Sequence, residues 1–97
     1  MPKGYWIARI IVTDPDRYGA YAQALPTVID RFGGRFLVAG GRLEAAEGEA
    51  RPRNVVIAFD DYDTARACWN SPEYANVMRL REDAASVDMV IVEGVAD

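Results

Sequence analysis

Two tyrosines and an arginine have the side chains best suited to act on a substrate in this chain. Tyr18 and Tyr21 lie about one helical turn apart, and Arg35 follows the pair Gly33-Gly34. A tyrosine hydroxyl can donate a hydrogen bond to an oxyanion, and an arginine can neutralise a carboxylate or an enolate. Tyr21 and Arg35 are therefore the candidate catalytic residues, with Tyr18 as a ligand contact. The alternatives are core packing for the tyrosines and a strand-end arginine that reaches solvent.

A second group of candidate ligand-binding residues gathers where one helical segment stops and another begins. Trp69, Asn70 and Tyr74 flank the pair Ser71-Pro72. An aromatic rim with one amide is a common way to hold a small, partly apolar ligand. The alternative is a helix junction filled by aromatic side chains. These three residues complete the predicted ligand-binding set with the two tyrosines and the arginine above.

Five other residues with reactive or charged side chains have mainly structural interpretations. Arg9 either anchors an anion or, as we favour, pairs with a carboxylate of a partner subunit. Arg51 and Arg53 are expected to be solvated charges. Glu93 ends the last apolar run as a paired carboxylate, with a general base as the alternative. Cys68 lies on an apolar helix side and is expected to be an inert core thiol.

Composition excludes several classes of function. The chain has 97 residues, which is the size of one domain spanning 1–97, and a formal net charge of −4. A nucleic-acid-binding protein needs a basic face, so the acidic charge argues against one. The chain has no histidine and one cysteine. We therefore predict no metal site and no cofactor, and the glycines of GGRFLVAGG do not have the spacing of a dinucleotide fingerprint.

The same features bear on location. A single cysteine allows no internal disulfide, which favours a reducing cytoplasm for so small a domain. The start MPKGYW shows no signal peptide, and no apolar run approaches the roughly 20 residues that span a bilayer. We therefore expect a cytoplasmic protein without a membrane partner.

Local signals predict the elements that position these residues. Residues 4–12 form an apolar strand, and Asp14 followed by Pro15 begins a helix that ends at Gly33. Pro26 removes a backbone hydrogen bond, so we expect a kink or break near residues 24–26.

The second half of the chain alternates strands with capped helices. Residues 35–39 read as a strand that resumes over 43–46 after a glycine bulge, and the polar EGEARPR closes a hairpin onto strand 54–59. Asp61 caps the next helix, and Ser71 with Pro72 caps its restart before the last strand, SVDMVIVEG. The order strand, helix, strand, strand, helix, strand predicts a ferredoxin-like α+β fold, with four antiparallel strands and the helices on one face.

Three of the four strands are apolar on both faces, which two helices on one side cannot cover. In the first strand Trp6 and Ile10 fall on one face, and Ile7 and Ile11 on the other. Soluble monomers avoid an exposed apolar patch of that size. We therefore predict a homodimer in which the sheet face opposite the helices packs on a second copy.

Five segments of the chain resemble the family known as domain of unknown function 1330. They are KGYWIARIIVTDPDRYGAY, GGRFLVAGGRLEAAEG, RPRNVVIAF, NSPEY and VIVEG. The resemblance covers nearly the whole chain and implies a dimeric α/β-barrel of ferredoxin-like subunits, without implying a reaction. The family often carries arginine where this chain has Ala39 and glutamate where it has Ala58, so a family activity that used those charges would be absent or altered.

Two functions are considered. The first is a homodimer that binds a small, partly apolar and possibly anionic metabolite between sheet and helices. The resemblance to the wider dimeric α/β-barrel group, which includes isomerases and cofactor-free monooxygenases, implies for it a cofactor-independent isomerase-like or monooxygenase-like activity. Arg35 would hold the anion, Tyr21 would donate a hydrogen bond, and Trp69 and Tyr74 would form the wall. The second is a non-catalytic dimeric ligand-binding or interaction module, which the lack of histidine favours.

Overall fold

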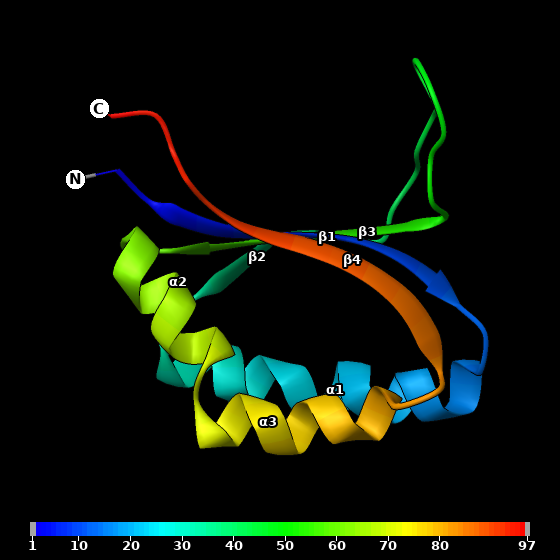
Figure 1. Cartoon of the computed structure of the whole chain (residues 1–97), viewed down its shortest axis with the longest axis horizontal. Helices are drawn as coiled ribbons and strands as arrows, with labels where there is room; N and C mark the ends of the chain where they lie inside the picture. Colours follow the sequence, from blue (N-terminus) through cyan, green and yellow to red (C-terminus); the bar gives the residue numbers. More distant parts are fainter. Residues whose placement is uncertain (1, 97) are drawn as a thin grey trace.

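The computed structural model describes residues 2–96 and contains one four-stranded antiparallel sheet. The elements are β1 (Gly4–Val12), α1 (Pro15–Arg31), β2 (Arg35–Ala39), β3 (Arg53–Phe59), α2 (Tyr62–Trp69), α3 (Pro72–Met78), the 3-10 turn η1 (Arg79–Arg81) and β4 (Ala85–Glu93). The strand order is β2-β3-β1-β4, and the helices all lie on one side of the sheet (Figure 1). The predicted ferredoxin-like fold is confirmed.

Helix α1 begins as predicted but is not broken at its internal proline. The Asp14 carboxylate accepts a hydrogen bond from the Arg17 amide at 3.2 Å, and Pro15 occupies the first turn. The predicted break at 24–26 is wrong, because the helix runs without interruption from Pro15 to Arg31. Pro26 is exposed, so the missing N–H lies on the solvent side, where water can serve the orphaned carbonyl. The buried residues on the opposite face hold the helix together through the proline.

The chain leaves the sheet after β2 instead of continuing it. The predicted strand over 43–46 is wrong, because Gly40 and Gly41 adopt left-handed φ values of 81° and 88° and turn the chain away from β3. Residues 40–52, called the arm below, rise from the sheet on the side opposite the helices (Figure 1). The expected hairpin pairing holds, since β2 and β3 are antiparallel, with a bulge between Phe36 and Val38.

The two short helices begin at the predicted caps. The Asp61 carboxylate accepts a hydrogen bond from the Thr64 amide at 2.7 Å, and this contact lowers the pKa of the Asp61 carboxyl. The Ser71 hydroxyl accepts one from the Tyr74 amide at 3.1 Å. These caps fix where α2 ends and α3 starts, and so place Tyr74 over the sheet.

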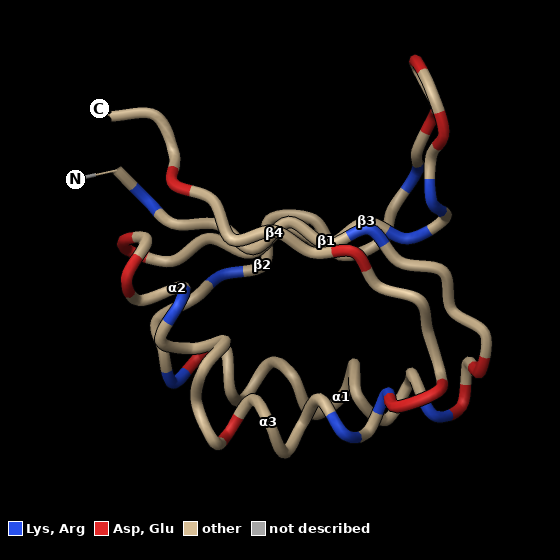
Figure 2. Tube along the Cα trace, in the orientation of Figure 1, with Lys and Arg blue, Asp and Glu red and all other residues tan. Residues whose placement is uncertain are grey.

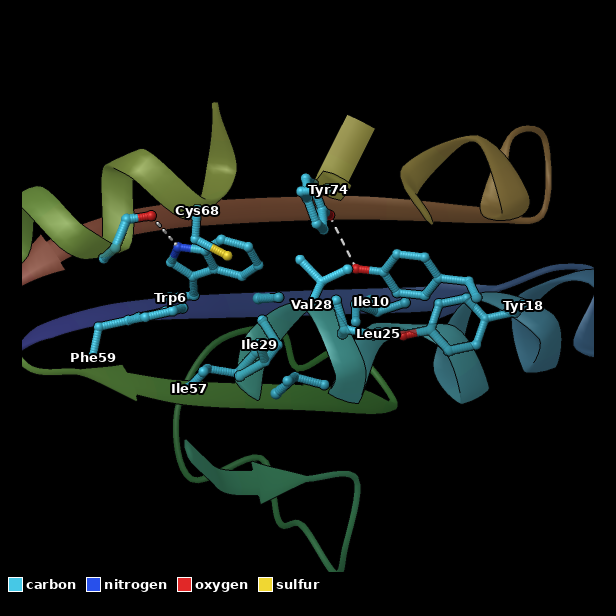
Figure 3. Close-up of a cluster of buried hydrophobic side chains, with 14 of the residues drawn as sticks. Trp6, Ile10, Tyr18, Leu25, Val28, Ile29, Ile57, Phe59, Cys68 and Tyr74 are labelled. Atoms are coloured by element: carbon cyan, nitrogen blue, oxygen red, sulfur yellow. Dashed lines mark hydrogen bonds between the residues drawn. The ribbon is translucent and has the colours of Figure 1, made fainter. Parts of the chain in front are cut away.

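The core fills the space between the helices and the inner face of the sheet (Figure 3). Trp6 is at its centre, and its Nε1 donates a hydrogen bond to the Ala65 carbonyl at 2.9 Å. Its ring packs against Phe59, with the ring centroids 5.3 Å apart. Cys68 is fully buried beside them, and burial raises the pKa of its thiol to about 12. This placement matches the predicted inert core thiol.

The face of the sheet opposite the helices, called the outer face below, is not covered by any helix or strand of residues 2–96. Ile7, Ile11, Val90 and Val92 are exposed on it, and Val90 shows 56% of its surface. Most charged residues lie in the arm and at the ends of elements, and Arg9 of β1 and Asp88 of β4 stand opposite each other within the sheet (Figure 2). Strands β1, β3 and β4 are apolar on both faces, as predicted.

Within residues 2–96, no helix is both long and apolar enough to cross a membrane.

Candidate functional site

A small cavity lies between the inner face of the sheet, α1 and the α3–η1 segment. Most of its lining is apolar: Trp6, Ala8, Ile10, Leu25, Val55, Ile57, Val87 and Met89. Tyr18, Tyr21, Tyr74 and Arg81 complete the lining. The space open to water-sized spheres is about 30 Å³, enough for roughly two water molecules. The aromatic side chains thus fill most of the gap between the layers.

The polar side of the cavity is a series of three hydrogen-bonded residues, one each from α1, α3 and η1. The Tyr21 and Tyr74 hydroxyl oxygens are 3.0 Å apart, a contact drawn as a dashed line to Tyr74 in Figure 3. Arg81 donates from Nη2 to the Tyr74 hydroxyl at 3.4 Å, and its guanidinium carbon lies 5.3 Å from the centroid of the Tyr21 ring. A permanent positive charge therefore sits beside two buried hydroxyls.

In this hydrogen-bonded series, one tyrosine hydroxyl proton is left for an acceptor in the cavity. Arg81 donates to Tyr74, and either tyrosine hydroxyl can donate to the other. When Tyr74 is the donor, the proton of Tyr21 is free for an acceptor in the cavity. Burial, reinforced by the neighbouring Tyr74, raises the pKa of Tyr21 well above its ordinary value, and Arg81 only partly offsets this. Tyr21 is thus a neutral hydrogen-bond donor at physiological pH, and not a base.

A second arginine meets the third tyrosine of the lining. Arg53 of β3 donates from Nε to the Tyr18 hydroxyl at 3.3 Å, and its guanidinium carbon lies 5.5 Å from the centroid of the Tyr18 ring. The Tyr18 and Tyr21 rings are neighbours, with their centroids 5.5 Å apart. The expectation that Arg53 is merely solvated is wrong, because strand β3 directs it to the helix side, opposite Ile10 of β1.

The structure brings three of the six predicted ligand-binding residues to the cavity. Tyr18, Tyr21 and Tyr74 line it. Trp69 lies outside the lining and packs on the Tyr74 ring, with the centroids 5.0 Å apart. Asn70 is exposed, and its side-chain amide donates to the Arg66 carbonyl at 2.9 Å, so it caps the end of α2. The aromatic cluster at the junction is therefore partly site and partly helix packing.

Arg35 lies on the other side of the sheet from the cavity. It stands opposite Ala58 in the β2–β3 register, and directly opposed residues share a face. Ala58 alternates with the inward-facing Ile57, so Arg35 projects from the outer face. The expected placement of Arg35 beside Tyr21 is corrected, and Arg81 stands there instead. The spacing of Arg81, seven residues after Tyr74 and hence two turns along one helical face, is the signal that could have identified it.

The remaining charged candidates, Arg9, Arg51 and Glu93, lie away from the cavity. Arg9 donates from Nη2 to the backbone carbonyl of Glu49 at 2.9 Å, a contact within its own chain. Arg51 pairs with Asp88 at 2.8 Å, so the prediction of a solvated Arg51 is wrong. Glu93 is exposed at the end of β4. Across residues 2–96, no group of three or more cysteine or carboxylate side chains is arranged to hold a metal ion.

Solved structures with the same fold include three that cover nearly all of this chain. A protein of unknown function from Rhodopseudomonas palustris has a TM-score of 0.72 at 15% identity, covering 99% of this chain and 85% of its own. A dimeric ferredoxin-like protein of unknown function from Thermobifida fusca has a TM-score of 0.63 at 22% identity, with 98% and 92% covered. SnoaB, a cofactor-independent oxygenase from Streptomyces nogalater, has a TM-score of 0.59 at 12% identity, with 100% and 97% covered.

These similarities establish the fold, and the Thermobifida fusca neighbour is described as dimeric. A search of curated proteins found no match. The profile of a family described as domain of unknown function (DUF1330) matches residues 3–95. The match includes every strand and helix, the three cavity tyrosines and Arg81. The chain is therefore a member of the DUF1330 family.

Proposed function

We propose that the protein is a homodimer that binds a small, largely apolar molecule carrying one oxyanion, such as a carboxylate, phenolate or enolate. The binding site is the cavity between sheet and helices. The observation that supports this is the meeting of Arg81 with the Tyr21–Tyr74 hydroxyl pair at the edge of an apolar lining. A few well-placed polar groups on an apolar surface are typical of small-molecule sites.

Electrostatics favours an anion at this position. The guanidinium of Arg81 cannot be neutralised at physiological pH, and no carboxylate is among the lining residues. An oxyanion would accept a charge-assisted hydrogen bond from Arg81 and a neutral one from Tyr21. The apolar remainder of the ligand would contact Trp6 and Met89.

The size of the cavity requires side chains to move when the ligand binds. A space of about 30 Å³ holds water and not a metabolite. Arg81 is only partly buried and ends the short turn η1, so its side chain is the one proposed to move. Its outward swing would open the cavity for entry while leaving the two hydroxyls in place, and its return would bring the guanidinium back to the oxyanion.

Benzoate and its neutral isostere benzamide test this proposal. Trp6 lines the cavity, so its fluorescence should report occupancy. We expect benzoate to bind about tenfold to a hundredfold more tightly than benzamide, the preference that a charged hydrogen bond provides. Arg81→Gln should abolish the preference, while Arg81→Lys should retain part of it. Equal binding of the two probes, or an unchanged preference in Arg81→Gln, would reject an anion site at Arg81.

Native mass spectrometry of the purified protein gives the subunit number and any retained ligand together. A mass of two chains carrying a small adduct would support both the homodimer and the binding of a small molecule. The same adduct can then be incubated with the protein for a prolonged period. Recovery of the unchanged molecule would favour a binding module, and slow conversion would favour an enzyme.

Catalysis is the second candidate function, suggested by the oxygenase activity in the name of SnoaB. Tyr21 could stabilise an enolate by hydrogen bonding, as an isomerase-like or monooxygenase-like reaction would require. The raised pKa of Tyr21 argues against its use as the base, however, and the chain has no histidine. Binding without turnover is for this reason the preferred function.

The proposed dimer interface is the outer face, and a lysine substitution tests it. Val90→Lys puts a charge at the most exposed apolar position of β4, so burial against a second sheet would leave that charge unpaired. We expect sedimentation equilibrium to show dissociation into monomers. Leu80→Lys, on η1 in the helix layer and 40% exposed, is the matched control and should remain dimeric.

A further inference from the structure

We infer that the arm, residues 40–52, is a clasp that grips the sheet of a second copy of this chain, with Leu43 as its anchor. The inference rests on the proposed dimer through the outer face. It goes beyond that proposal by assigning part of the interface to a segment outside the sheet.

The base of the arm is fixed to its own sheet, whereas its distal part is exposed and lacks hydrogen bonds to other elements. Arg9 of β1 binds the Glu49 carbonyl, and Arg51 binds both Asp88 and the Ser86 carbonyl of β4. Among the hydrogen bonds of residues 2–96, none joins residues 41–48 to another element, and all of these residues are exposed. Ordering a loop residue costs roughly 1–2 kcal/mol, and such hydrogen bonds do not offset that cost here. Loops of this length either serve a function or are disordered.

The direction of the arm places it beside any sheet that covers the outer face. It rises from that face at one end of the sheet, and the two chain termini rise at the other end (Figure 1). A second sheet packed on the outer face would therefore be bounded by the arm at one end.

Leu43 is near enough to contact such a second sheet. Packed sheets lie about 10 Å apart, and an extended chain spans at most roughly 3.3 Å per residue. Leu43 is three residues beyond Gly40, where the chain leaves the sheet, so it lies no more than about 10 Å from that point. Its side chain is 48% exposed in the single chain. An apolar residue in this position can pack against the edge of the partner's sheet.

Contacts along the arm would add to the surface that the outer face buries, and twofold symmetry would make them twice.

Leu43→Ser tests the clasp, with Leu80→Ser as the matched control. Leu80 is 40% exposed on η1, in the helix layer away from the outer face. Sedimentation equilibrium should show the dimer dissociation constant rising about a hundredfold for Leu43→Ser, since symmetry removes two anchors of about tenfold each. Leu80→Ser should leave it unchanged. A chain that joins Gly41 directly to Glu49 should dissociate at least as readily, and circular dichroism should show the fold of the parent in each variant.

The outcomes separate this inference from the proposed dimer. If Val90→Lys dissociates the dimer while Leu43→Ser and the shortened arm do not, the sheet interface stands and the clasp is rejected. If Leu43→Ser dissociates the dimer while Val90→Lys does not, the sheet packing that gives Leu43 its position is wrong, and the clasp is rejected with it. A parent chain that is monomeric at high concentration would reject both.

Discussion

The hydroxyl pair of Tyr21 and Tyr74 gives a prediction whose size follows from the structure. The two oxygens are 3.0 Å apart, and the residues are 7% and 1% exposed. Tyr74→Phe removes one oxygen and leaves the Tyr21 hydroxyl in a largely apolar lining without that partner. A buried hydroxyl left unpaired costs about 1–3 kcal/mol. The cavity admits water, which replaces part of the lost bond, so we expect the free energy of unfolding to fall by about 1–2 kcal/mol.

The double variant makes the prediction specific to the pair. Tyr21→Phe should destabilise by a similar amount, because it leaves the Tyr74 hydroxyl with only the longer contact from Arg81. Replacing both hydroxyls removes the unpaired group altogether, which is often nearly neutral. Tyr21→Phe with Tyr74→Phe should thus cost less than the sum of the single changes, with a coupling of about 1 kcal/mol.

Urea unfolding at one fixed protein concentration measures these free energies, since dimerisation makes stability depend on concentration. Tyr62→Phe on α2 is a control, and a hydroxyl outside such a network should change stability by no more than about 0.5 kcal/mol. Additive losses in the double variant would show that the two hydroxyls act independently. The Tyr21–Tyr74 hydrogen bond would then be refuted as a source of stability.

Three further outcomes can be checked on the same protein. Burial raises the pKa of Tyr21 above its value in the unfolded chain, which is about 10. The free energy of unfolding should therefore contain the full contribution of Tyr21 below pH 10 and should fall as the pH rises beyond it. Tyr21→Phe should flatten this fall in alkaline urea titrations. The Cys68 thiol, buried and with a pKa raised to about 12, should resist iodoacetamide until the chain unfolds, and rapid labelling of the folded protein would contradict its placement. Pro26→Ala restores a helical N–H at an exposed site and should stabilise the protein by about 1–3 kcal/mol, whereas a loss of stability would mean that the proline shapes α1.

The elements of the fold were predictable because their signals are local. Asp14, Asp61 and Ser71 precede helices whose first free amides they bind, and each cap is where the sequence indicated. Pro26 was misjudged because the cost of a proline depends on which face of the helix it occupies. The arm was misjudged because Gly40 and Gly41 permit either a bulge or a turn away from the sheet, and the choice is made by contacts distant in sequence.

The site was only partly predictable because its residues come from different helices and strands, which only the folded structure brings together. The spacing of Tyr18 and Tyr21 on one helix identified two lining residues. Arg35 was assigned to the wrong face because the register of β2 against β3 decides its side, and a shift of one residue reverses it. Arg81 was overlooked because its role depends on Tyr74 packing over the sheet, although the seven-residue spacing links the two.

Strand β1 links the two proposed properties of the molecule, which are ligand binding in the cavity and dimerisation through the outer face. Its residues Trp6, Ala8 and Ile10 line the cavity, and Ile7 and Ile11 between them belong to the outer face. A side chain that shifts on one face moves the same backbone that carries the other, since close-packed interiors transmit strain. A second sheet against the outer face would therefore stiffen the floor of the cavity. On this argument, Val90→Lys should weaken benzoate binding as well as dimerisation, although Val90 does not line the cavity.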